Sequence, residues 1–189
     1  MNLFHKLPIR VFLFCSLALL AVMSGCDSGE PDDDAGENEL ITRVTLILTP
    51  VAGGDLIIAE AEDPDGDGAN LTIDSLQLTS GAIYQGEITL FDGVNNEDIT
   101  AEVEDEEEEH QFWYTAEGGI ADRVTVAITD TDANDLPVGL AFTVSVSVGA
   151  DTTGTMNVVL NHYEEGEKEG TDRSDETDID IDFPVSIIQ

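Results

Sequence analysis

The clearest chemistry in this sequence is the binding of a hard cation by a short acidic loop. Residues 63–74 (DPDGDGANLTID) alternate carboxylates with other residues and carry a glycine at the sixth position, where such a loop turns sharply. Calcium takes roughly six to eight oxygen ligands, and a loop of this length supplies them from positions 1, 3, 5 and 12 and from the carbonyl at position 7. Those positions hold Asp63, Asp65, Asp67, Asp74 and the Ala69 carbonyl. The spacing therefore predicts a Ca²⁺ site.

A second acidic segment, 130–135 (DTDAND), is a weaker candidate for the same chemistry. It offers fewer anions and no glycine, and its candidate ligands are Asp130, Asp132, Asn134 and Asp135. Both segments are flanked by strand-like sequence, so we expect calcium loops on a β scaffold and not an EF-hand, which also prefers Glu at position 12. The alternative for both is a solvated turn, because Asp, Pro, Asn and Gly form tight turns without a metal.

Catalytic chemistry finds little support in the sequence. No nucleophile elbow, zinc-protease helix motif or phosphate-binding glycine loop is present. Beyond residue 25 the histidines are His110 and His162, and two isolated histidines do not predict a zinc site. No pair stands out among 41 acidic residues as the acid and base of a hydrolase. We therefore predict a non-enzymatic protein; the alternative is a solute-binding or uptake accessory with a ligand pocket near Trp113.

The first 25 residues have the features of a secretory signal peptide. Lys6 and Arg10 precede an apolar run at 11–23, which is shorter than the roughly 20 residues that a bilayer span requires. Residues 23–26 (MSGC) resemble the lipobox of bacterial lipoproteins, which implies cleavage before Cys26 and acylation of its thiol. The alternative is an ordinary signal peptide that leaves Cys26 as a free thiol.

Residues 26–39 are predicted to be a flexible acidic tether, because 27–39 contains no large apolar side chain. Asp27 resembles an inner-membrane retention signal of enteric bacteria. The acidic cluster at 30–34 resembles a surface-export signal of another Gram-negative group. We expect an outer-membrane anchor, facing the periplasm or the cell surface; the alternative is a solvated spacer. The lipid anchor then makes the membrane a partner.

The charge of the chain excludes a further class of partner. Six basic and 41 acidic side chains give a formal charge of −35. Such a protein is repelled by nucleic acids and by anionic lipid surfaces. The apolar fraction of 41% is still sufficient for a folded core. A surface of this kind suits high salt, which screens the repulsion between carboxylates.

From residue 40 onward, apolar and polar residues alternate with the period of half-buried strands. We expect one domain over 40–189, an all-β, immunoglobulin-like sandwich of about seven to nine short antiparallel strands. The predicted strands are 41–49, 56–61, 76–79, 84–91, 111–115, 123–129, 140–148, 156–160 and 179–187.

Two local features accompany the strands. Within 96–109 we expect a short helix or loop, because Ile99 and Val103 share one helical face after an Asn cap. Residues 49–63 also line up with 115–130 as a possible internal repeat, against the alternative of chance similarity among β segments.

The segment 96–114 (NEDITAEVEDEEEEHQFWY), followed by Asp-x-Asp and by LPVGL at 136–140, resembles a family of small, acidic, uncharacterised bacterial lipoproteins. The resemblance covers most of residues 40–188. The label associated with that family, type 1 periplasmic binding fold, implies a two-lobed α/β protein that binds sugars or amino acids. The residues instead favour the sandwich, because βαβ alternation is absent.

Overall fold

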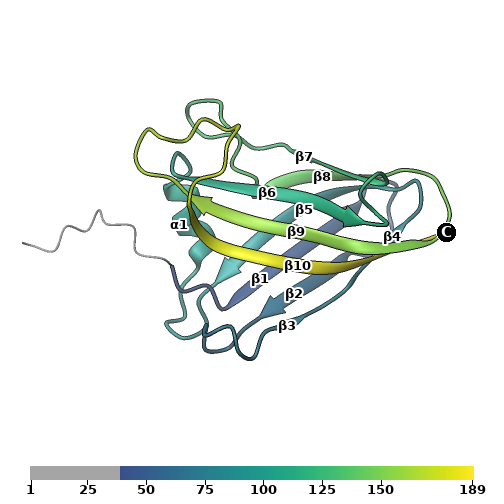
Figure 1. Ribbon diagram of the computed structural model, residues 1–189, viewed down its shortest axis with the longest axis horizontal. Coiled ribbons are helices and arrows are strands. Elements are labelled where there is room, and N and C mark those ends of the chain that lie inside the picture. Colours follow the sequence, from purple (N-terminus) through teal and green to yellow (C-terminus); the bar gives the residue numbers. More distant parts are fainter. Residues whose placement is uncertain (1–38) are drawn as a thin grey trace, which may run out of the picture. The chain divides into compact units, whose positions relative to one another are not determined.

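The computed structural model describes residues 39–189, which form two β-sheets packed face to face (Figure 1). The predicted signal peptide, Cys26 and most of the tether lie outside the described residues. Glu39, which we assigned to the tether, belongs to the folded part and is half-buried. The elements are β1 (Arg43–Pro50), β2 (Ile57–Glu62), β3 (Thr72–Ile73), β4 (Leu76–Thr79), β5 (Ile83–Phe91), α1 (Ile99–Asp105), β6 (His110–Gly118), β7 (Val124–Ile128), β8 (Ala141–Val146), β9 (Thr152–His162) and β10 (Glu176–Ile188).

One sheet has the strand order β3-β2-β1-β5-β8-β7, and the other has the order β4-β10-β9-β6. The predicted all-β sandwich is confirmed, and the α/β fold implied by the family label is not found. All nine predicted strands are present. The tenth, β3, has two residues, too few to produce an alternating pattern. One pair also differs from the antiparallel prediction, because β4 and β10 run parallel.

The core lies between the two sheets and follows the period-two pattern of the sequence. Strand β1 buries Val44, Leu46 and Leu48 on one face, and the intervening residues are partly exposed. Strand β10 contributes Phe183 and Val185 from the opposite sheet. Each such side chain contributes roughly 1.5–3 kcal/mol when it is fully buried. The apolar core is therefore sufficient to explain the sandwich without a disulfide.

Helix α1 confirms the short helix predicted within 96–109, and it buries Ile99 and Val103. The cap differs from the prediction: the N-cap residue is Asp98, and its side chain makes no capping hydrogen bond. Asn96 instead takes a left-handed conformation, with φ of 61°, in the turn before the helix. Thr100 Oγ1 accepts a hydrogen bond from the Leu90 amide in β5 at 2.8 Å. Contacts with β5, and not a side-chain cap, therefore hold this helix in place.

The two segments of the possible repeat are connected differently in the fold. Within 49–63, β1 and β2 form an antiparallel hairpin in one sheet. Within 115–130, the chain passes from β6, which pairs with β9, to β7, which pairs with β8 in the other sheet. The pairing pattern therefore does not repeat.

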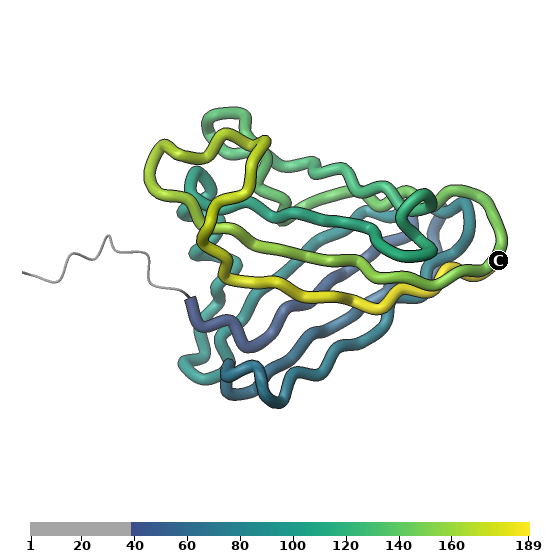
Figure 2. Tube along the Cα trace, in the orientation of Figure 1, coloured from purple at the N-terminus to yellow at the C-terminus, as the bar shows by residue number. Residues whose placement is uncertain are grey.

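Four acidic loops lie together at one end of the sandwich, which we call the acidic end. Strands β2, β5, β7 and β9 end there, and β1, β6, β8 and β10 begin there (Figure 2). The segments are 63–71, 92–109 (which includes α1), 129–140 and 163–175, and they carry more than half of the chain's 41 acidic residues. The predicted site residues lie at this end, with Asp74 just after β3.

Candidate cation sites at the acidic end

The first predicted loop brings three of its carboxylates together. Oxygens of Asp63, Asp65 and Asp67 lie within 4.8 Å of one another. Asp63 is only 8% exposed, and its Oδ2 accepts a hydrogen bond from the Gly68 amide at 2.6 Å. Its other oxygen, Oδ1, is buried and has no hydrogen-bond partner among residues 39–189. A buried carboxylate oxygen normally has a partner, so this one is available to a cation.

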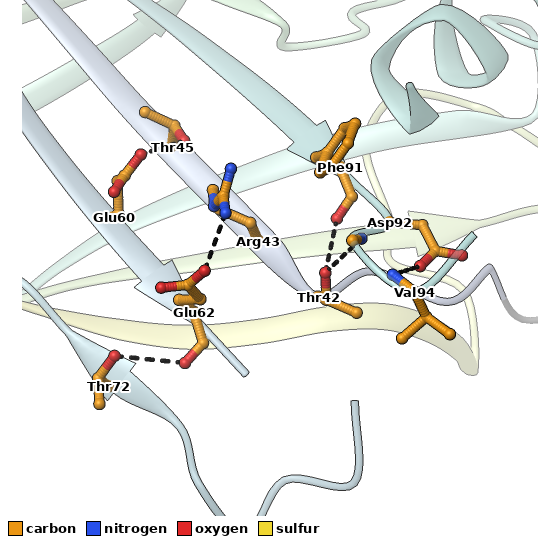
Figure 3. Close-up of polar contacts among 10 residues, drawn as sticks. Thr42, Arg43, Thr45, Glu60, Glu62, Thr72, Phe91, Asp92 and Val94 are labelled. Carbon is orange, nitrogen blue, oxygen red and sulfur yellow. Dashed lines mark hydrogen bonds and ion pairs between the residues drawn. The ribbon is translucent and has the colours of Figure 1, made fainter. Parts of the chain in front are cut away.

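The start of β1 positions Asp63. The Thr42 carbonyl accepts a hydrogen bond from the Asp63 amide at 2.9 Å. The Thr42 hydroxyl donates to the Phe91 carbonyl at 3.2 Å and accepts from the Gly93 amide at 2.7 Å (Figure 3). Thr42 is itself buried. Thr42 therefore connects the start of the acidic loop to the end of the adjacent strand β5.

Glycine provides the sharp turns that fold this loop back on itself. Gly66 has φ of 67° and lies directly against the Leu40 side chain, so that no larger residue fits without displacing Leu40. Gly68, the sixth position, has φ of 75° and presents its amide to Asp63. Both values lie in the left-handed region, which glycine adopts without steric cost. The sequence correctly predicted a turn at the sixth position.

Electrostatic repulsion acts within this group of carboxylates. Partial desolvation and the neighbouring charges of Asp67 and Asp63 raise the pKa of Asp65 above its ordinary value. The neighbouring carboxylates therefore disfavour the ionised form of Asp65. A divalent cation among them would reverse this effect, because opposite charge favours ionisation.

The fourth predicted side-chain ligand of this loop does not join the group. Asp74 lies beyond β3, and its Oδ2 accepts a hydrogen bond from the Glu60 amide at 3.2 Å. Its own amide donates to the Glu60 carbonyl at 2.8 Å, which extends the pairing of β2 and β3. The Ala69 amide donates to Asp67 Oδ1 at 2.8 Å, as in a tight Asp turn. The structure thus brings together positions 1, 3 and 5 of the predicted loop.

The second predicted loop uses its carboxylates to organise the backbone. Asp130 Oδ1 accepts from the Gly139 amide at 2.9 Å, and its Oδ2 accepts from the Ala141 amide at 3.1 Å. Asp132 Oδ1 accepts from the amides of Asn134 and Leu136. The candidate ligands Asn134 and Asp135 are exposed. The four candidate ligands of this loop do not converge on one point.

A lysine occupies the position that we had assigned to a cation in this second loop. Lys168 Nζ lies 2.9 Å from Asp132 Oδ2, and the two side chains are 1% and 0% exposed. Nζ also donates to the Glu107 carbonyl at 2.7 Å. The prediction of a metal at Asp132 is therefore corrected, because an internal ammonium group neutralises the carboxylate. The sequence signal for this role was that Lys168 is the one lysine beyond residue 25.

The ammonium group also changes the protonation of Asp132. Burial raises the pKa of this carboxyl, but the hydrogen bond from Lys168 and those from the Leu136 and Asn134 amides outweigh burial, so the pKa is lowered. Asp132 therefore stays ionised at neutral pH. The pair joins the loops 129–140 and 163–175 to the turn that contains Glu107.

A third polar group was missed by the sequence analysis. His110, the first residue of β6, lies directly opposite His162, the last residue of β9. One ligand atom from each of these residues and from Asp178 lies within 4.8 Å of the others. The three residues come from three adjacent strands, β6, β9 and β10. No spacing in the sequence reveals this group, because it depends on the register of strands about 50 residues apart.

The aromatic residues around Trp113 lie on different faces of β6. Phe112 is fully buried in the core, and the Tyr114 hydroxyl donates to the Gly139 carbonyl at 2.6 Å. Trp113 lies on the other face of β6, half-buried, with the Arg173 guanidinium 5.7 Å from the centre of its ring. The three aromatic residues therefore alternate across the strand, and Arg173 occupies one face of the indole.

Among residues 39–189, no helix has both the length and the apolar character needed to cross a membrane.

Comparison with known proteins assigns the chain to no family. No protein-family model and no curated protein matches the chain. Among solved structures, the chain is similar to domains 4 and 5 of the S-layer protein SbsC, with 14% sequence identity and a TM-score of 0.31. The similarity covers 77% of this chain and 77% of that one. A likeness of this degree assigns no function, so function must be argued from the site.

Proposed function

We propose that this protein is a non-enzymatic, lipid-anchored lipoprotein of the bacterial outer membrane, which serves binding or envelope structure and is stabilised by Ca²⁺. Residues 23–26 support the anchor, with Cys26 as the acylated residue. The calcium assignment depends on one observation. Asp63 is buried, one of its oxygens lacks a partner in the described part of the chain, and Asp65 and Asp67 converge on it.

The expected affinity follows from the number of protein ligands. Three carboxylates supply fewer oxygens than the roughly six to eight that Ca²⁺ takes, so water must complete the coordination. Extracellular calcium modules bind with dissociation constants of about 10⁻⁴–10⁻³ M. We expect this loop to bind in that range. Such a site would be filled outside the cell and would stabilise the exported domain.

The calcium proposal is tested by thermal unfolding in Ca²⁺ and in EGTA at fixed ionic strength. At about 5 mM Ca²⁺ the site should contribute about 1–2 kcal/mol. The melting temperature should then rise by about 2–8 °C for a domain of this size. The Asp65→Ala, Asp67→Ala double variant should lose this rise, because it removes two of the three converging carboxylates.

The matched control removes two exposed carboxylates at the opposite end of the sandwich. An Asp55→Ala, Asp122→Ala double variant makes the same change in net charge and should keep the Ca²⁺-dependent rise. Equal rises with Ca²⁺ and with NaCl of the same ionic strength would contradict the proposal, because they would indicate charge screening alone.

The anchor is tested separately with a Cys26→Ser variant of the full chain. The unaltered protein should partition into detergent, because two or more acyl chains give stable membrane attachment. The variant should be recovered in the aqueous phase. Equal partitioning of the two proteins would show that the thiol of Cys26 carries no anchor.

A further inference from the structure

At the acidic end, a stacked pair of histidines lies beside an aspartate at an irregular position of β10. The rings of His110 and His162 are nearly parallel, at 14°, with centroids 4.7 Å apart. Asp178 lies at an irregularity in the pairing of β10 with β9. Thr177 and Ile179 pair with successive residues of β9, and Asp178 between them has no partner there. A β-bulge re-aims a side chain, and bulges recur at functional sites.

The hydrogen bonds of His110 determine which of its nitrogens is free. Its Nδ1 lies 3.2 Å from the Glu106 carbonyl oxygen, which can only accept, so Nδ1 carries the proton. Nε2 is then an unprotonated acceptor. It is buried, and no donor reaches it within the described residues, while the residue as a whole is 1% exposed. A histidine that binds a metal commonly donates its other N–H to a backbone carbonyl in this way.

Two carboxylates with unpartnered oxygens complete the group. Both oxygens of Asp178 are buried and form no hydrogen bond with any residue from 39 to 189, and the same holds for Glu39 Oε2. A Glu39 oxygen also lies within 4.8 Å of a ligand nitrogen of His110. The group thus gathers buried carboxylate oxygens that have no hydrogen-bond partner among the described residues.

We propose that His110, His162 and Asp178 bind a Zn²⁺ ion, with Glu39 as the fourth ligand. Imidazole nitrogen with carboxylate oxygen is a ligand set for zinc, whereas Ca²⁺ takes oxygen alone. Tetrahedral zinc has ligands about 2.0–2.2 Å from the metal, so two ligand atoms lie about 3.3–3.6 Å apart. The ligand atoms of His110, His162 and Asp178 lie within 4.8 Å of one another and reach that separation with small side-chain movements.

The proposed ion would have a structural role that differs from that of the calcium loop. Glu39 is the last residue of the predicted tether, and the other three ligands come from adjacent strands of one sheet. Four protein ligands leave no open position for catalysis. The ion would therefore fasten the point at which the chain enters the sandwich to the ends of β6 and β9 and the start of β10.

Zinc binding is tested on the full chain, stripped with EDTA and dialysed against low-micromolar Zn²⁺ in the presence of excess Ca²⁺. We expect one tightly held zinc ion per chain, measured by elemental analysis. The Asp178→Asn and His162→Gln variants should each bind at least about 100-fold more weakly, since loss of an outer-shell partner alone costs about 10–100-fold. The Asp65→Ala, Asp67→Ala variant is the matched control and should keep its zinc.

Three outcomes would overturn the proposal: no saturable zinc binding by the unaltered chain, unchanged affinity in the folded Asp178→Asn and His162→Gln variants, or loss of zinc in the control. The two variants change half-buried residues, so that their folding is less at risk than that of a His110 variant. If either variant fails to fold, NMR of the unaltered chain decides. Zinc should shift the ring signals of both His110 and His162, and unchanged signals would reject the site.

Discussion

Each basic side chain in the described part of the chain makes a specific contact. Arg123 illustrates this at the end opposite the acidic loops, where it donates to the carbonyls of Ser147 and Ala150. Arg43 pairs with Glu62 at 2.9 Å (Figure 3). Lys168 pairs with Asp132 in the interior, and the Arg173 guanidinium lies over the Trp113 ring. In a chain with so few positive charges, these charges lie where loops or strands must be joined.

Replacing Lys168 with methionine should strongly destabilise the protein. The change leaves the buried carboxylate of Asp132 without its ion-pair partner, and breaking a buried pair in this way costs about 3–5 kcal/mol. Urea unfolding should show that loss at neutral pH. A Lys168→Met, Asp132→Leu double variant should regain part of it, because no unpaired charge remains.

The surface pair between Arg43 and Glu62 is the matched control for this change. The side chains are 39% and 43% exposed, so an Arg43→Met variant should lose less than about 1 kcal/mol. A Lys168→Met variant no less stable than Arg43→Met would contradict the assignment of Lys168 as the cation that joins three loops.

The same pair should affect stability in acid. Because the pKa of Asp132 is lowered in the folded protein, its contribution is complete above the ordinary value of 3.8 and is lost as the pH falls through the folded value. The stability gap between the unaltered protein and an Asp132→Asn variant should therefore be widest near pH 6 and should narrow below pH 4. Urea unfolding across this range measures the gap, and parallel curves would contradict the assignment.

At the scale of the elements, β5 and β8 depend on a glycine beneath an aromatic ring. Gly86 in β5 is paired with Phe142 in β8, and a methyl group at Gly86 would overlap the Phe142 ring. A Gly86→Ala variant should therefore lose about 1–3 kcal/mol through overpacking, measured by urea unfolding. The exposed neighbour Gln85 is the control, because Gln85→Ala should change stability by less than about 0.5 kcal/mol.

A compensating change tests whether overlap is the cause. Phe142→Leu shortens the side chain above Gly86, so a Gly86→Ala, Phe142→Leu double variant should lose less than the sum of the two single losses. Residues in contact show such non-additivity. Additive losses would indicate that the alanine acts on the β5 backbone and not through the ring.

The sequence predicted the elements well because their signals are local. Alternating residues identified nine strands, and Ile99 and Val103 identified the helix face. The two-residue β3 and the parallel pairing of β4 with β10 were missed. Neither has a local signal, since a two-residue strand shows no period and strand direction depends on which distant strands become neighbours.

The candidate sites show the same difference between contacts with a local sequence signal and contacts that depend on distant residues. Asp63, Asp65 and Asp67 lie within five residues, so their spacing predicted their convergence. The partner of Asp132 lies 36 positions away at Lys168, and His110 meets His162 only through the register of β6 and β9. Contacts of this kind depend on packing between elements, and one sequence contains no direct record of them.

At the scale of the whole molecule, the acidic loops concentrate like charge at one end of the sandwich. Within 92–109 alone, helix α1 is followed directly by the run Glu106–Glu109. Negative charge at a helix C-terminus is unfavourable, because it opposes the helix dipole. The buried ammonium of Lys168 and the cations proposed here would act against this repulsion from within the same end.

This distribution of charge predicts that salt stabilises the fold. With a formal charge of −35, the folded chain repels itself, and raising NaCl from about 0.1 M to about 1 M shortens the screening length from about 10 Å to about 3 Å. The melting temperature in EGTA should rise by at least about 2–4 °C, equivalent to about 1 kcal/mol for a domain of this size. Near the isoelectric pH of about 4.1 the same salt should have a much smaller effect, because many carboxylates are protonated. An equal rise at both pH values would show that NaCl acts through something other than repulsion between the carboxylates.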